Sequence, residues 1–113
     1  PSPAIKQQVL EKETARLMAI IPENSFVVLL DVIGKQISSP ELAAKIDSLT
    51  LSGTSHITFV IGGAFGYTDA LRKRADFASS FSKMTFPHQL MRVILCEQIY
   101  RAFRIIQHEP YHK

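Results

Sequence analysis

The sequence predicts a single α/β domain with a mainly parallel sheet, and three features of the 113-residue chain support this fold class. Two apolar runs, residues 26–32 and 56–61, show no alternation of polar and apolar side chains, which is typical of strands buried on both faces. A third, shorter run of small residues lies at 77–81. Helical patterns separate these runs, and strands that alternate with helices favour parallel pairing.

Four helices accompany the predicted strands. Ser2 is placed to cap the first of them, and Ser39, followed by proline and glutamate, opens the second. Pro87 fits the first turn of the last helix, with Thr85 as its cap, and we expect a turn at residues 33–36. The predicted helices cover residues 3–20, 39–52, 68–74 and 89–107.

Composition limits the class of protein further. A hydrophobic content of 46% with 20% charged residues is ordinary for one globular domain, and we expect residues 1–113 to form that domain. The chain has one cysteine, Cys96, so no disulfide can form within it, which favours a reducing, cytoplasmic setting. No apolar run approaches the length of a membrane-spanning helix, so we expect no membrane partner.

Positive charge is concentrated in the second half of the chain. Residues 1–56 hold five Lys/Arg and six Asp/Glu, a net charge of −1, whereas residues 57–113 hold eight and four, a net charge of +4. Such an asymmetry favours an anionic partner for the second half, although a solvated basic face explains the charge equally well.

The last predicted helix carries a broad apolar stripe with one misfit. Arg92 lies in the middle of this stripe, and a buried arginine is costly unless it is paired. An ion pair with Asp31 or with Glu97 of another subunit would satisfy it, and so would a direct role toward a substrate. A stripe this apolar also favours a dimer interface. Its members are Val93, Cys96, Ile99, Tyr100, Phe103 and Ile106.

Ligands of parallel sheets bind at the loops beyond the carboxyl ends of the strands, here residues 30–35, 62–67 and 81–87. Three glycines within residues 62–66 fit either a tight turn or a backbone that approaches an adenosine-like ligand closely. A full dinucleotide motif is absent, because Ile61 stands where its first glycine is needed. Residues 81–86 combine backbone groups with phenylalanine, methionine and threonine side chains, which suits a flat base with polar edges.

Other chemistries have little support in the sequence. The serines lack the pattern of a nucleophile elbow, and the histidines His88, His108 and His112 lack the spacing of metal ligands. The terminal tripeptide, residues 111–113, joins an aromatic ring, a titratable base and a cation. It is either a frayed end or part of a site.

Several blocks of the chain resemble one known family. They are FVIGGAFG at residues 59–66, SSFSKMTFPHQLMRV at 79–93, EQIYRA at 97–102 and YHK at 111–113. These blocks look like those of the ribosomal RNA large subunit methyltransferase H family, which belongs to the SPOUT class of methyltransferases. The resemblance covers essentially the whole chain from Ser25 onward.

The resemblance implies an α/β knot, in which the C-terminal segment forms a trefoil knot, and a homodimer with its active sites at the interface. It implies S-adenosyl-L-methionine as cofactor and N3 of a pseudouridine in 23S rRNA of the assembled ribosome as the methylated position. No metal is implied. The cofactor contacts that it implies are Leu30, Gly62, Phe81, Ser82, Lys83, Met84, Thr85 and Phe86.

The same resemblance nominates catalytic residues. Tyr111, His112 and Lys113 would hold or deprotonate the target base, and Arg92 would face the site or the partner subunit. Whether His112 acts as a base or as a hydrogen-bond donor stays open. The family carries a strand and a helix that have no counterpart before residue 1, so we expect a shortened form. The alternative function is a non-catalytic RNA- or nucleotide-binding α/β module.

Overall fold

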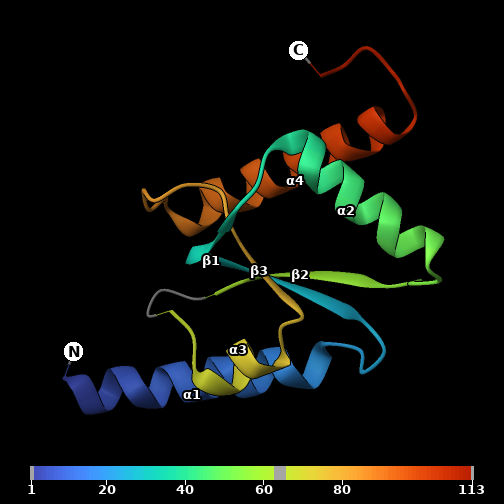
Figure 1. Cartoon of the computed structure of the whole chain (residues 1–113). Helices are drawn as coiled ribbons and strands as arrows, with labels where there is room; N and C mark the ends of the chain where they lie inside the picture. The colour runs from blue at the N-terminus through green and yellow to red at the C-terminus, as the bar shows by residue number, and fades with distance from the viewer. Residues whose placement is uncertain (1, 63–65, 113) are drawn as a thin grey trace.

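A computed structural model describes residues 2–62 and 66–112 of the chain. Strands and helices alternate along this part of the chain, and the predicted α/β class is confirmed (Figure 1). The elements are α1 (Pro3–Ile20), β1 (Phe26–Gln36), α2 (Ser39–Leu51), β2 (Ile57–Ile61), α3 (Asp69–Arg74), β3 (Phe77–Ser80) and α4 (His88–Ile106).

The sheet has the strand order β2-β1-β3, and both neighbours run parallel to the central strand β1. Helices α1 and α3 lie on one face of the sheet, and α2 and α4 lie on the other (Figure 1). Every residue from Val27 to Leu30 is buried, because helices cover β1 from both sides. This burial explains the absence of alternation in the sequence of the strand.

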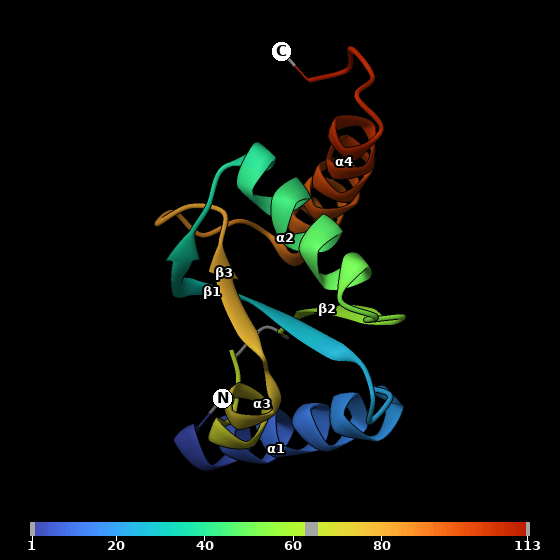
Figure 2. The same ribbon diagram turned by 45° about the vertical axis from the view of Figure 1, so that its right-hand side comes forward.

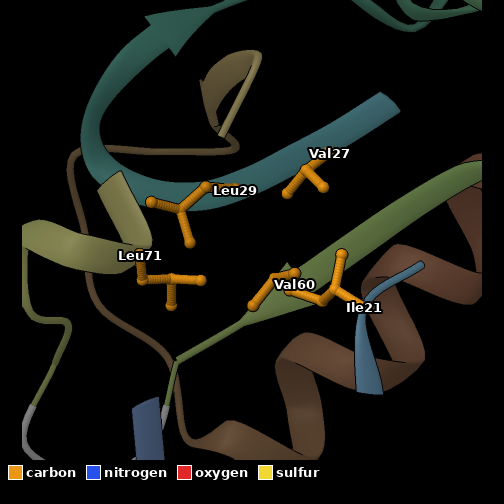
Figure 3. Packing of buried hydrophobic residues seen from close by; sticks show 5 residues of the cluster. All are labelled: Ile21, Val27, Leu29, Val60 and Leu71. Carbon is orange, nitrogen blue, oxygen red and sulfur yellow. The ribbon is translucent and has the colours of Figure 1, made fainter. Parts of the chain in front are cut away.

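Each face of the sheet carries its own apolar core. The core beside α1 and α3 consists of Ile21, Val27, Leu29, Val60 and Leu71, whose side chains converge in Figure 3. On the other face, Ala102 of α4 packs among α2 residues. That second core consists of Leu42, Ala43, Ile46 and Ala102, with Ile57 and Phe59 of β2 against it.

Strand β1 pairs with β3 at two separate places. Leu30 lies opposite Ser79, the chain then departs from the ladder, and Lys35 lies opposite Ser79 again. The turn expected at residues 33–36 is therefore wrong, because β1 continues through these residues to Gln36, and Figure 2 shows the strand bending there. A Cβ atom on Gly34 would come within 2.8 Å of the backbone of Ala78 and Ser79, so only glycine fits this close approach.

The helix starts agree with the sequence in part. Ser2 caps α1 as predicted, and its hydroxyl accepts a hydrogen bond from the Ile5 N–H at 3.2 Å. The cap of α2 is Ser38 rather than Ser39, because Ser38 and Glu41 satisfy each other's backbone N–H groups in a capping box. Pro87 occupies the N-cap position of α4, where no side chain caps the backbone, so the predicted role of Thr85 is wrong.

The apolar stripe predicted for α4 packs on the protein core only in part, since of its members Ile106 lies against the second core. Helix α4 buries Leu95 and Ala102, the latter against α2, whereas the side chains of Val93 and Phe103 are 65% and 46% exposed. Arg92 is exposed as well, so an ion pair buried within the chain is wrong, whereas a partner in another subunit or a role toward a substrate stays a prediction. Ala102 occupies the packed face because its small side chain allows two helices to approach closely.

Replacement of Gly34 tests the double pairing of β1 with β3. Gly34→Val places a side chain against the β3 backbone, and overpacking of this kind costs about 1–3 kcal/mol of unfolding free energy. Urea unfolding measures the loss. The control is Ile33→Ala at the neighbouring position, where the side chain is 78% exposed and the stability should hardly change. Equal stability of both variants would show that β1 does not need the close approach.

Candidate functional site

A cavity of about 570 Å³ opens at the carboxyl ends of the strands, where ligands of parallel sheets bind. Three separate segments supply its walls: the chain after the first half of β1, the glycine loop after β2, and the connection from β3 to α4. Among the residues that line the cavity are Leu30, Asp31, Gly62, Tyr67, Arg72, Ser79 and His88, together with residues 81, 82 and 84–86.

Seven of the eight residues predicted to contact a cofactor line this one cavity. Lys83 is the exception, and its side chain is exposed to solvent. Their convergence follows from topology, because the carboxyl ends of parallel strands lie at the same edge of the sheet. Their role as cofactor contacts stays a prediction. Gly63, in the same loop, lies outside the described residues.

Gly62 is held between an aromatic ring and an imidazole. A Cβ atom at this position would overlap the ring of Tyr67, and the Tyr67 hydroxyl donates to the carbonyl oxygen of Leu30. On the other side, Nδ1 of His88 lies 3.0 Å from the carbonyl oxygen of Gly62. Burial raises the pKa of Tyr67, so this hydroxyl keeps its proton and acts as a donor. These contacts fix the three walls of the cavity relative to one another.

Ser79 leaves a polar atom unsatisfied in the cavity wall. Its residue is 2% exposed, and its hydroxyl oxygen has no hydrogen-bond partner among the described residues. The neighbouring Ser80 hydroxyl, in contrast, donates to the carbonyl oxygen of Ser82 at 2.8 Å. A buried polar group without a partner is costly, and a ligand in the cavity would satisfy it. The site therefore fits a ligand with polar atoms, and the flexible, apolar Met84 and Phe86 beside it fit a flat ring.

One ion pair lies in the cavity wall. Oδ2 of Asp31 is 3.6 Å from Nε of Arg72, and Oδ1 of Asp31 accepts a hydrogen bond from the Ile33 N–H. Its carboxylate is therefore occupied within the chain, as is that of Glu97, whose oxygens accept from Arg101. The two partners considered for Arg92 thus have other partners, and Arg92 itself donates to Gln89 at 3.4 Å.

Four residues of the site were not recognised from the sequence: Tyr67, Arg72, Ser79 and His88. Tyr67 and Ser79 lie within or beside blocks that had been noted, but nothing in a sequence shows that a hydroxyl lacks a partner. His88 lies within the block at residues 79–93, but as a single residue it had been considered only as a metal ligand. Its position directly after Pro87, at the start of α4, was the available signal.

The residues predicted to be catalytic lie away from the cavity of their own chain. Arg92, Tyr111 and His112 do not line it, and Lys113 lies outside the described residues. Tyr111 is anchored on α4, where its hydroxyl donates to Oε2 of Glu97 at 2.8 Å and its ring meets that of Tyr100 edge-on at 5.0 Å. The tail is therefore docked on α4 in the structure, and its catalytic role stays a prediction.

Two other kinds of site find no support in the residues that the structure describes. Within residues 2–62 and 66–112, no three His, Cys, Asp or Glu side chains come together as metal ligands. None of the described helices is long and apolar enough to span a membrane.

The fold and the cavity define a ligand-binding α/β protein, and comparison with known proteins defines its family. A family model described as "Predicted SPOUT methyltransferase" matches residues 2–112. The ribosomal RNA large subunit methyltransferase H of Bifidobacterium adolescentis is 55% identical over 112 residues, which are 99% of this chain and 70% of that protein. The protein of the same name from Finegoldia magna is 52% identical over 108 residues, 96% of this chain and 68% of its own length.

A relative from Methanococcus maripaludis is 55% identical over 113 residues, all of this chain and 71% of the relative. The chain therefore belongs to the SPOUT methyltransferases, and within them to the ribosomal RNA large subunit methyltransferase H family. The resemblance seen in the sequence is confirmed. The trefoil knot that it implies stays a prediction.

Two adjacent serines test whether the unsatisfied hydroxyl belongs to a ligand site. Ser79→Ala removes a buried oxygen without a partner, so the free energy of unfolding should stay equal or rise. Ser80→Ala removes a made hydrogen bond and should cost about 1 kcal/mol. Urea unfolding of the ligand-free protein compares the two. A larger loss for Ser79→Ala than for Ser80→Ala would mean that Ser79 already has a partner in the fold.

Proposed function

We propose that the protein transfers a methyl group from S-adenosyl-L-methionine to N3 of a pseudouridine in 23S rRNA of the assembled ribosome. One observation carries this proposal: three strand-end segments that carry the family's cofactor motifs converge on one cavity with an unsatisfied buried hydroxyl. The names of the relatives support the rRNA substrate. Activity on ribosomes would place the protein in the cytoplasm.

Backbone and apolar side chains of the cavity would hold the cofactor. Leu30 and Gly62 offer main-chain groups at two strand ends, and residues 81–86 offer main-chain groups with the side chains of Phe81, Met84 and Phe86. When bound, S-adenosyl-L-methionine supplies an electrophilic methyl group on a sulfonium centre. The chain's own task is then to orient the acceptor nitrogen and to manage its proton, since positioning lowers the barrier strongly.

The tail residues Tyr111 and His112 are our candidates for contact with the target base. They lie on α4, away from the cavity of their own chain, so they would act at the cavity of a second copy. The exposed apolar face of α4, with Val93, Tyr100 and Phe103, supports a homodimer because an apolar patch of this kind is seldom left in water. Basic residues of the second half of the chain would contact rRNA phosphates.

Mass spectrometry of rRNA tests the proposed function. Ribosomes from cells that lack this methyltransferase are incubated with the protein and S-adenosyl-L-methionine, and the 23S rRNA is digested and analysed. We expect 3-methylpseudouridine to appear at one position, and only when ribosomes rather than free rRNA are supplied. A protein that binds ribosomes without methylating them would instead be a non-catalytic RNA-binding module.

A substitution in the glycine loop tests the cofactor site. Gly62→Val places a branched side chain where Tyr67 already packs, which displaces the ring from Leu30 and reshapes the cavity. Calorimetry with S-adenosylhomocysteine should show affinity weakened by about tenfold or more, equivalent to about 1.4 kcal/mol. Gly53→Ala, at a glycine away from this cavity, is the control for loss of stability alone. Unchanged affinity in a folded Gly62→Val variant would remove the glycine loop from the site.

A charge on the exposed face of α4 tests the homodimer. Phe103→Glu introduces a carboxylate where a second copy would pack, so light scattering should show a monomer or aggregates. Gln107→Glu adds the same charge at an exposed position at the end of α4 and should leave the assembly unchanged. If Phe103→Glu stays soluble and fully dimeric, the interface lies elsewhere.

A further inference from the structure

Two ion pairs hold the tail of the chain on α4: Arg101 pairs with Glu97, and Arg104 pairs with Glu109 of the tail itself. Arg101 donates from Nε to Oε1 of Glu97 and from Nη2 to Oε2 of Glu97, both at 3.1 Å. This bidentate pair holds the two tail residues at once. Tyr111 donates its hydroxyl hydrogen to Oε2 of Glu97, and Nη1 of Arg101 lies 3.0 Å from Nδ1 of His112. The guanidinium also lies 4.9 Å from the centre of the Tyr111 ring.

The contact with Arg101 determines where the proton of His112 lies. A guanidinium has five N–H donors and no acceptor, so the nitrogen that faces it must be the acceptor of the hydrogen bond. Nδ1 of His112 therefore carries no hydrogen in this arrangement. In a neutral imidazole the hydrogen then lies on Nε2, which makes Nε2 a donor toward any group that it meets.

Tyr111, in contrast to His112, presents a hydrogen-bond acceptor. Its only hydrogen is committed to the Glu97 carboxylate, and this bond raises the pKa of Tyr111, so the hydroxyl stays protonated. Its oxygen retains lone pairs that can accept a hydrogen bond. The cluster of Glu97, Arg101, Tyr111 and His112 thus presents one acceptor and one donor.

The geometry points to Glu97 and Arg101 as positioning residues that fix Tyr111 as a hydrogen-bond acceptor and His112 as an Nε2–H donor toward the target base. This role rests on the proposed function. The reacting edge of a uracil-type base is an N–H group flanked by carbonyl groups, which one acceptor and one donor complement. As N3 loses its proton, negative charge spreads onto the carbonyl oxygens, and a preorganised donor such as Nε2–H stabilises that charge. His112 is therefore a donor to the base and not the acceptor of its proton, which passes to solvent water at the exposed tail residues.

Nuclear magnetic resonance of the 15N-histidine-labelled 113-residue chain tests the proton arrangement without ribosomes. The His112 signals are assigned by their absence in His112→Gln. We expect Nδ1 without a proton and Nε2 with one, and we expect Arg101→Met to move the Nδ1 resonance. Arg16→Met is the control, since Arg16 is an exposed arginine on α1, away from the tail. A proton on Nδ1, or an Nδ1 resonance that is the same in Arg101→Met as in the wild type, would overturn the proposed arrangement.

Ribosome methylation by the same variants tests whether the proton arrangement of His112 contributes to catalysis. His112→Ala should lower kcat by about 10²-fold, the loss typical of one preorganised donor. His112→Gln should recover most of this loss, because its amide N–H can replace Nε2–H but cannot act as a base. Glu97→Gln and Arg101→Met should lower kcat while the affinity for S-adenosylhomocysteine stays unchanged, and Glu23→Gln, at an exposed position after α1, should have no effect.

Two outcomes separate the possible failures. If His112→Gln is as inactive as His112→Ala, His112 is a base and the donor role is wrong. If the wild-type chain leaves ribosomes unmethylated, the proposed function is wrong, and so is the role of His112 as a donor to the target base. The resonance experiment still decides whether Arg101 fixes the His112 proton in that case.

Discussion

Strand β1 meets β3 twice at the same residue, and the cavity exists because of this double pairing. Between Leu30 and Lys35, both opposite Ser79, four residues leave the ladder, and the first two of them, Asp31 and Val32, line the cavity. The detour is possible because Gly34 lets the returning backbone pass within van der Waals contact of β3. The strand ends of an ordinary parallel sheet are open, whereas here the central strand turns back over the edge strand and encloses the space beyond it.

The cavity wall contains a buried hydroxyl without a hydrogen-bond partner in the part of the chain that the structure describes, and the free-energy cost of this group indicates a ligand site. The backbone at Ser79 is paired with both halves of β1, and the Ser79 hydroxyl is buried with no partner among the described residues, while Ser80 donates to the carbonyl oxygen of Ser82. A fold selected for stability alone would place alanine there, because an unpaired buried hydroxyl costs about 1–3 kcal/mol. An unsatisfied polar atom in the wall of a cavity is expected where a ligand completes the hydrogen bonding.

The features of the structure that depend on local sequence pattern and on strand topology could be predicted from the sequence. Uniformly apolar strands indicated the parallel sheet, and the rule that ligands bind at strand ends selected the loops 30–35, 62–67 and 81–87. The family resemblance then selected Leu30, Gly62 and residues 81–86 within them, most of which line the cavity. The prediction failed for α4, because apolar residues occupy more than one side of this helix and periodicity cannot show which side meets α2. The small Ala102 was the better guide to the packed face than the larger Phe103. The cluster at the tail joins residues 10 to 15 positions apart through a frayed-looking terminus, so no local pattern predicts it.

Docking of the tail on α4 depends on pH through the charge of Glu97. The hydrogen bonds from Arg101, and then that from Tyr111, lower the pKa of Glu97, so its carboxylate is stabilised in the docked state relative to a detached tail. A group whose pKa is lowered contributes its stabilisation above its ordinary pKa and loses it as the pH falls through the lowered value. Docking of Tyr111 is therefore favoured at neutral pH, weakens in acid as Glu97 takes up a proton, and weakens in alkali as the pKa of Tyr111, raised by the same hydrogen bond, is passed. At neutral pH, Glu97 and Arg101 hold both tail residues in place in the free protein, so in the proposed role the substrate would not have to drive ordering of the tail.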